Sequence, residues 1–397
     1  MTTAVIVDAV RTVSGKGKPG GQLSGAHPAQ LLSQVLRTFV ERTGLDPALV
    51  EDVIGGCVDQ AGEQALNITR SAVLGAGFPE TVPATTIDRQ CGSSQQAAHF
   101  AAQGVLAGAY DVVIACGVES MSRVPMGTPA MGKDAFGPAV AARYPEGLVE
   151  QGISAELIAA RWKLDRSTLD EFTARSHARA AATAAAGGFA TEIVPVTVPG
   201  PDGEPHTVAA DETVRANTTA EGLAGLKPSF RDEALGERFP EIDWRITPGN
   251  SSPLTDGASA VLIMSEDKAR ALGLRPRASF HSFAVTGSDP LLMLTGVIPA
   301  TQRILARADL SIEDIAAYEV NEAFAPVPLV WQQEFGADED KLNPHGGAIA
   351  LGHPLGASGT RLLTTLVNHL EAAGGRYGLQ TMCEGGGMAN ATIIERL

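Results

Sequence analysis

The sequence predicts an α/β protein, and three observations lead to that prediction. Short apolar runs alternate with helix-like segments near both ends of the chain. Glycine accounts for 44 of the 397 residues while aromatic residues make up only 5%, a composition typical of helices packed closely on a sheet. Hydrophobic residues reach 44% and charged residues 19%, which disfavours a disordered chain or a coiled coil.

The first third of the chain is expected to alternate between strands and helices. Continuous short apolar runs are typical of buried strands, whereas Leu31, Val35 and Phe39 recur at the spacing of one helix face. In chain order, we expect a strand at 3–7, a helix at 28–44, a strand at 53–57, a helix at 67–75, a strand at 84–87, a helix at 94–106 and a strand at 111–116.

The middle of the chain has a different texture. Glycine and proline cluster at 125–138, and two polar helical stretches follow at 154–162 and 167–186. This pattern indicates a less regular insertion that covers part of the molecule. The alternation then resumes, with a strand expected at 258–264, a helix at 301–308 and a strand at 315–320.

Charge and cysteine content exclude several classes of protein. A formal net charge of −15 argues against a nucleic-acid-binding surface. No apolar run approaches the ~20 residues of a membrane span, and the N-terminal segment does not resemble a secretory signal. The four cysteines lie far apart without a CxxC pair, so neither a disulfide framework nor a metal site is indicated. We expect a cytoplasmic protein with reduced thiols.

Cys91 is the first candidate for chemistry. It lies between the strand expected at 84–87 and the helix expected from residue 94, in a turn of small residues. The positive end of a helix dipole favours a thiolate over a thiol, and free backbone N–H groups there can bind an oxyanion. The alternative is a buried structural cysteine, and Cys57 and Cys116, inside apolar strands, are interpreted in that way.

A second candidate, His353, lies in the glycine-rich segment 343–359. So many glycines fit a backbone that wraps closely around a ligand or another segment rather than a regular helix or strand. A histidine held in such a loop is a candidate catalyst, although an isolated histidine is more often a satisfied core residue. His345, in the same loop, is interpreted as structural.

Two further candidates follow expected strands. Cys383 precedes the three glycines 385–387, whose N–H groups could form a second anion site, although a tight turn with an incidental thiol explains the pattern equally. Asn321 ends the strand expected at 315–320, where α/β folds place functional groups, although a cap or turn role is the simpler interpretation.

The two ends of the chain also repeat each other weakly. Cys91-Gly92-Ser93 opens a helix that leads to a strand ending near Cys116, and Ser358-Gly359-Thr360 does the same at an equal spacing before Cys383. This repetition suggests duplicated βα units.

Taken together, the motifs around Cys91, Asn321, His353 and Cys383 resemble those of the thiolase family, in order and over essentially the whole chain. The resemblance implies a five-layered α/β/α/β/α fold of two similar halves plus an inserted loop domain. The implied boundaries are 1–121 with 249–272 for the N-terminal half that carries the nucleophile, 122–248 for a loop domain that contacts coenzyme A, and 273–397 for the C-terminal half.

The resemblance also implies a role for each motif residue. Cys91 is the expected nucleophile, and His353 accepts its proton and, with a water held by Asn321, stabilises the first oxyanion. Cys383 is the expected second acid and base. The backbone amides of Cys91 and Gly385 form the expected second oxyanion hole. An enolate leaving group needs both a stabilised charge and a proton donor, so two thiols and two anion sites suit the reaction.

Binding residues follow from the same resemblance. Ser252 matches a position that contacts the pantetheine arm, Lys227 lies where a basic residue near the nucleotide phosphates is typical, and Gln151 begins the helix of the loop domain. No permanently bound cofactor is expected, because coenzyme A is substrate and product. The resemblance further implies a homodimer that pairs into a homotetramer.

Departures from the family pattern bear on the substrate. Ser94 and Gln95 after the Cys91 motif and the segment 251–254 are similar to those of actinobacterial thiolases of fatty-acid or steroid side-chain breakdown. The expected function is therefore thiolytic cleavage of a 3-ketoacyl-CoA. The alternatives are a biosynthetic acetyl-CoA acetyltransferase and an inactive acyl-CoA-binding scaffold. A ketosynthase is disfavoured because such enzymes place His or Asn where Cys383 stands.

Overall fold

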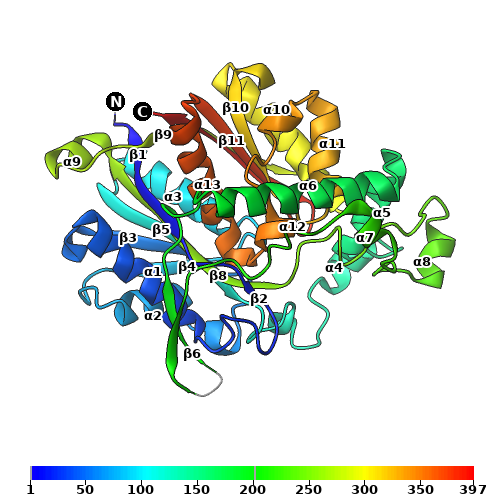
Figure 1. Cartoon of the computed structure of the whole chain (residues 1–397), viewed down its shortest axis with the longest axis horizontal. Coiled ribbons are helices and arrows are strands. Elements are labelled where there is room, and N and C mark those ends of the chain that lie inside the picture. Colours follow the sequence, from blue (N-terminus) through cyan, green and yellow to red (C-terminus); the bar gives the residue numbers. More distant parts are fainter. Residues whose placement is uncertain (1, 201–202) are drawn as a thin grey trace.

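The computed structural model describes residues 2–200 and 203–397, and its centre is one mixed β-sheet (Figure 1). Along the sheet the strands run in the order β10-β11-β12-β9-β1-β8-β5-β3-β4, and a short β2 pairs with β8. Their bounds are β1 (Ala4–Arg11), β2 (Gly15–Lys16), β3 (Asp52–Gly56), β4 (Ala84–Ile87), β5 (Val112–Ser120), β8 (Thr255–Ser265), β9 (Ala278–Gly287), β10 (Ile315–Val320), β11 (Tyr377–Glu384) and β12 (Met388–Arg396).

The sheet consists of two halves with the same topology. From the centre outward, β1 and β8 are antiparallel, β8 and β5 are antiparallel, and β5 and β3 are parallel. The strands β9, β12, β11 and β10 repeat that order and those directions. The halves meet where β1 pairs with β9, through Val5 with Ser279 and Ile6 with Ala278. The repeated topology confirms the duplication expected from the sequence.

Helices complete five layers. The helices α3 and α13 lie between the two halves of the sheet, α1 and α2 cover the N-terminal half, and α10 and α11 cover the C-terminal half (Figure 1). Their bounds are α1 (Pro28–Thr43), α2 (Ile68–Gly75), α3 (Ser93–Leu106), α10 (Val297–Ala308), α11 (Pro326–Phe335) and α13 (Ser358–Ala373). None of the helices in the described ranges carries an apolar stretch long enough to cross a membrane.

Small side chains explain why α3 can occupy the middle layer. Ala97, Ala98, Ala101 and Ala102 are all buried in the cluster that joins both half-sheets to α13. Alanine has high helix propensity and lets helix and sheet backbones approach closely. Small side chains are therefore found on the faces of α3 that meet the sheet and α13, whereas the aromatic Phe100 lies on its exposed side.

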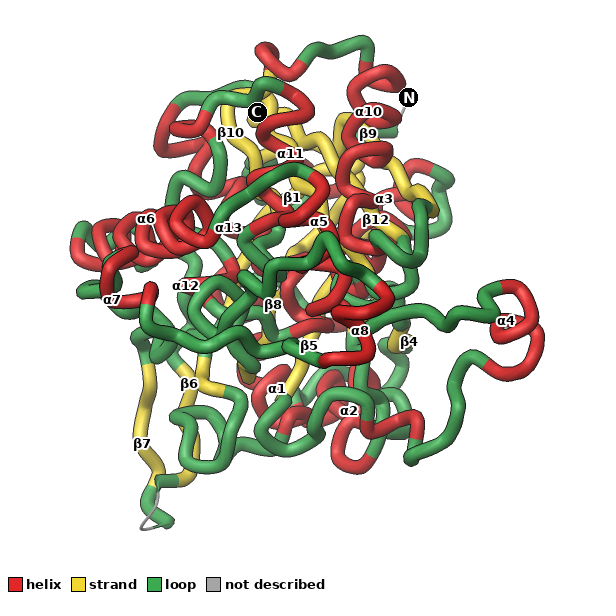
Figure 2. Tube along the Cα trace, turned by 90° about the vertical axis from the view of Figure 1, so that its right-hand side faces the viewer, coloured by secondary structure: helices red, strands yellow, loops and turns green. Residues whose placement is uncertain are grey.

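The segment between β5 and β8 forms helices and one hairpin rather than another half-sheet. Figure 2 shows the part around α4 and the β6–β7 hairpin extending away from the body in different directions. Its elements are α4 (Gly137–Arg143), α5 (Gln151–Arg161), α6 (Arg166–Ala185), β6 (Val196–Pro199), β7 (Pro205–Val208), α7 (Ala220–Ala224) and α8 (Glu233–Arg238), and the short helices α9 (Glu266–Ala271) and α12 (Ala348–Leu351) follow later in the chain.

Most elements expected from the sequence are present, with different ends. The strand at 84–87 and the strand at 315–320 have the expected bounds, whereas β1 continues beyond residue 7 to Arg11. The sequence analysis did not identify β9 and β12. Both contain buried Ser, Thr or Asn side chains, so they lack the continuous apolar run that indicates a buried strand.

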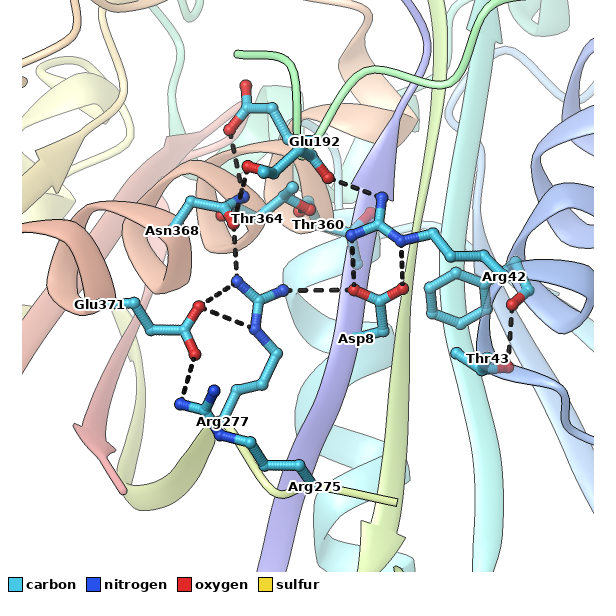
Figure 3. Close-up of polar contacts among 12 residues, drawn as sticks. Asp8, Arg42, Thr43, Glu192, Arg275, Arg277, Thr360, Thr364, Asn368 and Glu371 are labelled. Carbon is cyan, nitrogen blue, oxygen red and sulfur yellow. Dashed lines mark hydrogen bonds and ion pairs between the residues drawn. The ribbon is translucent and has the colours of Figure 1, made fainter. Parts of the chain in front are cut away.

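A network of charged side chains joins the two halves close to the β1–β9 contact (Figure 3). Asp8 of β1 accepts hydrogen bonds from Arg42 of α1 and from Arg277, which precedes β9, both at 3.2 Å. The Arg277 guanidinium also donates to Glu371 of α13 at 3.0 Å and to Asn368 at 2.6 Å. Because these groups are largely buried, each carboxylate depends on the arginines for its solvation.

We predict that Arg277→Met lowers the free energy of unfolding in urea by about 2–3 kcal/mol, because it leaves Asp8 and Glu371 without a buried partner. Arg376→Met is the matched control. That arginine pairs with Glu395 but is 69% exposed, so its loss should change the unfolding curve little. Equal losses for the two variants would contradict a bridging role for Arg277.

Candidate active site

Three distant segments converge around Cys91. Cys91 lies in the turn between β4 and α3, and its side chain is 4% exposed. It belongs to a small buried cluster that includes Leu355, two residues after His353, and Met382, the neighbour of Cys383. The segments that carry the Cys91, His353 and Cys383 motifs therefore pack against one another, and the roles expected of these residues stay predictions.

The electrostatics of Cys91 differ from the expectation. Burial raises the pKa of the Cys91 thiol well above its ordinary value, and the charges that Cys383 and Glu384 can carry raise it further. A hydrogen bond from its own backbone N–H acts in the opposite direction. The thiolate expected from the helix N-terminus is thus not the resting form, because desolvation outweighs the dipole. Cys91 is a neutral thiol that needs a base.

His353 has a defined tautomer. Its Nδ1 lies 2.6 Å from Ser358 Oγ, and the single hydroxyl proton of Ser358 is donated to the carbonyl of Pro354 at 2.9 Å. The hydrogen-bond network therefore assigns the imidazole proton to Nδ1, which donates to Ser358. The lone pair is then on Nε2, which accepts a hydrogen bond from Asn321 Nδ2 at 3.3 Å.

The same imidazole is uncharged over a wide pH range. Burial lowers the pKa of His353 to about 3, and the positive charge of Arg361 acts in the same direction. A neutral imidazole with its lone pair on Nε2 is the form that can accept a proton from a thiol.

Asn321 directly follows β10 and is 1% exposed. Its backbone N–H donates to the Thr381 carbonyl of β11 at 3.1 Å, which fixes it beside the strand that carries Cys383. Its Oδ1 is buried and has no hydrogen-bond partner among the described residues. A buried acceptor without a partner is suited to a water or a substrate group.

The loop that carries His353 reaches the N-terminal half through a backbone contact. A Cβ atom on Gly356 would lie 2.6 Å from Cys57 Cα and 2.6 Å from the Gly56 carbonyl, so only glycine fits there. The Gly356 N–H donates to Glu119 at 2.9 Å. The Glu119 carboxylate also accepts the N–H groups of Val58 and Asp59, so it ties the loop to the ends of β3 and β5.

Cys383 lies near the end of β11 and is 1% exposed. Burial raises the pKa of its thiol to about 12, and the charge of Glu384 raises it too. Gly385 lies beside Gln90, the residue before Cys91, because a Cβ atom on Gly385 would be 3.1 Å from Gln90 Oε1. The backbone around Gly385 and the turn of Cys91 are therefore neighbours.

The candidates for coenzyme A binding lie in segments that contain or contact an aromatic pair. Phe230 and Phe324 pack edge to face, with ring centroids 6.0 Å apart. Half-buried Ser252 donates its backbone N–H to the carbonyl of the residue before Phe324 at 3.0 Å. Gln151 begins α5 just before Gly152, which packs against Phe230, while exposed Lys227 lies three residues before that ring. These contacts link Ser252 directly to the Asn321 segment, and Gln151 and Lys227 only through Phe230.

Three further residues organise the site and were missed by the sequence analysis. They are Glu119, Glu322 and Ser358. Glu322, next to Asn321, accepts hydrogen bonds from Asn343 at 2.8 Å and from Ser176 at 2.7 Å, so it fixes the start of the glycine-rich loop. The sequence offered one signal for two of them: Glu119 and Glu322 are both acidic residues at the end of an apolar run that predicts a strand.

Comparison with known proteins places this geometry in context. The family model described as Thiolase, N-terminal domain, matches residues 4–267, and that described as Thiolase, C-terminal domain, matches residues 274–396. Together they span almost all of the chain.

Proteins similar to this chain are named as 3-ketoacyl-CoA thiolases or as an acetyl-CoA acetyltransferase. The steroid 3-ketoacyl-CoA thiolase FadA6 of Mycobacterium tuberculosis is 47% identical over 405 residues, covering 100% of this chain and 95% of that protein. A 3-ketoacyl-CoA thiolase of Vibrio cholerae is 44% identical over 400 residues, with both chains fully covered. Among solved structures, the Bacillus anthracis acetyl-CoA acetyltransferase has a TM-score of 0.89 at 37% identity, covering 100% of this chain and 99% of that one.

We predict that His353 stays neutral, with its proton on Nδ1, from pH 5 to pH 9, because burial lowers its pKa to about 3. Nitrogen-15 NMR of histidine-labelled protein checks this, with the His353 signal assigned by its loss in His353→Gln. Ser358→Ala should mix the two tautomers without charging the ring. If the His353 imidazole instead gains its proton with a midpoint between pH 5 and pH 9, burial does not lower its pKa to about 3.

Proposed function

The chain belongs to the thiolase family, and from this premise we propose that it cleaves a 3-ketoacyl-CoA with free coenzyme A, giving acetyl-CoA and a shortened acyl-CoA through an acyl-Cys91 intermediate. The observation that carries the proposed mechanism is the presence of two buried pairs, Cys91 beside Cys383 and His353 beside Asn321, whose neighbouring residues pack around Cys91. The roles assigned below to these residues are part of the proposal.

In the first step, His353 Nε2 accepts the Cys91 proton and the thiolate attacks the C3 carbonyl of the substrate. The imidazolium that forms is costly in a buried site, so it exists only while an anion lies beside it. Its new Nε2–H donates to the developing oxyanion, together with a water held by Asn321. Collapse of this intermediate breaks the C2–C3 bond.

In the second step, the departing enolate of acetyl-CoA is held by the amides of Cys91 and Gly385, and the Cys383 thiol protonates its C2 carbon. The Cys383 thiolate then takes the proton of an incoming coenzyme A thiol, whose sulfur attacks acyl-Cys91. This attack breaks the Cys91–acyl bond and releases the shortened acyl-CoA, and the Cys91 thiolate takes its proton back from the His353 imidazolium. Because the pKa of Cys383 is about 12, its thiolate is a strong base and returns readily to the neutral form.

The direction of the reaction follows from the relatives. Proteins named 3-ketoacyl-CoA thiolase are 42% to 47% identical to this chain, which favours degradation over the biosynthetic condensation of two acetyl-CoA molecules. We propose fatty-acyl or steroid side-chain substrates, in agreement with the name of the relative FadA6.

Coenzyme A is proposed to enter as substrate and product, along the segment 122–248. The Ser252 backbone bonds to the residue before Phe324, which follows Asn321 by three positions, while Gln151 and Lys227 lie near Phe230 through Gly152 and along the chain. In this arrangement Ser252 contacts the pantetheine arm and Lys227 the phosphates, where its exposure keeps the ammonium group available.

We further propose a homodimer that pairs into a homotetramer in the cytoplasm. The strand β4 ends the sheet with one edge unpaired in the described chain, and Leu66 beside it is 94% exposed. Met131 and Phe136, in the projecting segment 125–138, are 83% and 62% exposed. The free cysteines fit a reducing compartment.

Cys91→Ala should lower kcat for thiolysis by about three orders of magnitude or more, because no other group can carry the acyl intermediate. Binding of coenzyme A, measured by calorimetry, should persist. Cys383→Ser should still allow acetyl-CoA to acetylate Cys91, detected by mass spectrometry, but should slow the complete cycle. Turnover that survives in Cys91→Ala would refute the assigned nucleophile, and wild-type protein that binds acyl-CoA without turnover would favour the scaffold alternative.

A second experiment separates degradation from biosynthesis. We expect kcat/KM for longer or steroid-derived 3-ketoacyl-CoA thioesters to exceed that for acetoacetyl-CoA by about tenfold or more, because each methylene that finds an apolar pocket adds to transition-state binding. A tenfold preference for the four-carbon substrate would instead favour the acetyltransferase alternative.

A further inference from the structure

Glu384 is a buried acid that the proposed mechanism does not use. It is the last residue of β11 and directly follows Cys383. Its side chain is 0% exposed, and neither carboxyl oxygen has a hydrogen-bond partner among the described residues. An ionised carboxylate without a partner is costly in such surroundings, so this position favours the neutral acid.

The carboxyl group lies against the turn that carries Cys91. A Cβ atom on Gly92 would be 2.0 Å from Glu384 Oε1 and 2.8 Å from Asn390 Nδ2, so these two side chains fill the space that glycine leaves open. Asn390 Nδ2 also donates to the Gly92 carbonyl at 3.1 Å. Glu384 therefore packs beneath the backbone whose amides are proposed to bind the enolate.

The charged and titratable groups around Glu384 come from two segments, residues 88–91 and β11. Arg89 and Asp88 precede the Cys91 turn, Cys91 lies in it, and Cys383 is the neighbour in β11. Burial raises the pKa of Glu384 to about 8, Arg89 opposes that shift and Asp88 adds to it. No ion pair joins Arg89 to Glu384 in the described ranges, and Arg89 Nε is itself buried without a partner.

We propose that Glu384 is a positioning residue that supports the Cys91 turn as a neutral carboxylic acid. Its ionisation at alkaline pH lowers the reactivity of the two thiols. The inference rests on the proposed function for its meaning in catalysis, but its physical basis is the packing of Glu384 alone.

The sign of the effect follows from charge. Below about pH 8 the acid is neutral and does not oppose the anions at Cys91, at Cys383 or on the enolate. Above that pH, loss of its proton places a negative charge beside all three. Each thiolate then becomes harder to form, since like charges in a buried site repel strongly. An ordinary thiol becomes more reactive in this alkaline range because it ionises. The thiols of this site would gain less reactivity over the same range.

The test compares the rate of Cys91 alkylation by iodoacetamide, resolved by mass spectrometry, in the wild-type chain and in Glu384→Gln. The amide has the shape of the neutral acid and cannot ionise. At pH 6.5 we expect the alkylation rates of the two proteins to agree within about twofold. At pH 9.5 we expect the variant to react about three to ten times faster. A Cys91 pKa that is lower by about half to one unit in the variant would raise its thiolate fraction by that factor.

Two further variants exclude simpler explanations. Glu319→Gln is the matched control, because Glu319 is equally buried, has no hydrogen-bond partner on either oxygen and faces Arg361 rather than the thiols. It should leave the pH dependence of alkylation unchanged. Glu384→Met removes the charge without an amide and should reproduce the Glu384→Gln result if the charge is what matters.

Each outcome bears on the proposal. A Glu384→Gln to wild-type ratio that is the same at both pH values would reduce Glu384 to a packing residue and overturn it. Alkylation does not require turnover, so this result stands whether or not Cys91→Ala proves inactive. In the active protein, kcat/KM of Glu384→Gln should fall less than that of wild type between pH 8 and pH 9.5.

Discussion

The active-site geometry depends on one close contact between backbones. The turn that follows His353 lies directly on the ends of β3 and β5, where a Cβ on Gly117 would be 2.2 Å from the Gly356 carbonyl. The Glu119 carboxylate holds this turn against the strand ends, because it accepts the backbone N–H of Gly356 in the turn and that of Val58 after β3. Any larger side chain at this contact would displace the loop that carries His353 from the strand ends, so the glycines there fix the position of that loop.

Burial then determines the chemistry that these groups can perform. The two thiols and the imidazole are all at most 4% exposed, and burial shifts each pKa toward the uncharged form. The resting site is therefore neutral, and charge arises only during a reaction that moves protons between neighbours. Such an environment strengthens the hydrogen bonds that backbone amides offer to an oxyanion or enolate.

Duplication supplied the scaffold, and the two copies serve different purposes. The N-terminus of α3 follows the turn of Cys91, while the N-terminus of α13 begins with Ser358, whose hydroxyl orients His353. Equivalent places in the two halves thus provide the proposed nucleophile and the hydroxyl group that orients its proposed base. The C-terminal half adds Asn321 and Cys383 from the ends of the parallel strands β10 and β11. A site shared between two halves requires that they keep their relative position, which the network around Arg277 supports.

The sequence by itself determined the α/β class, the strand–turn–helix unit at Cys91 and the glycine-rich setting of His353, because these depend on local patterns of a few residues. It could not reveal β9 and β12, because their polar side chains are buried through contacts with distant segments, such as those of Thr392 with Gln95 and His99 of α3. It also showed the helix N-terminus that favours a thiolate at Cys91 but not the desolvation that opposes one, since only the first is visible locally. Glu119 and Gly356 are 237 positions apart, and Asn390 and Gly92 are 298 apart. Only the tertiary structure brings such residues into contact, and contact and burial together decide which groups carry charge.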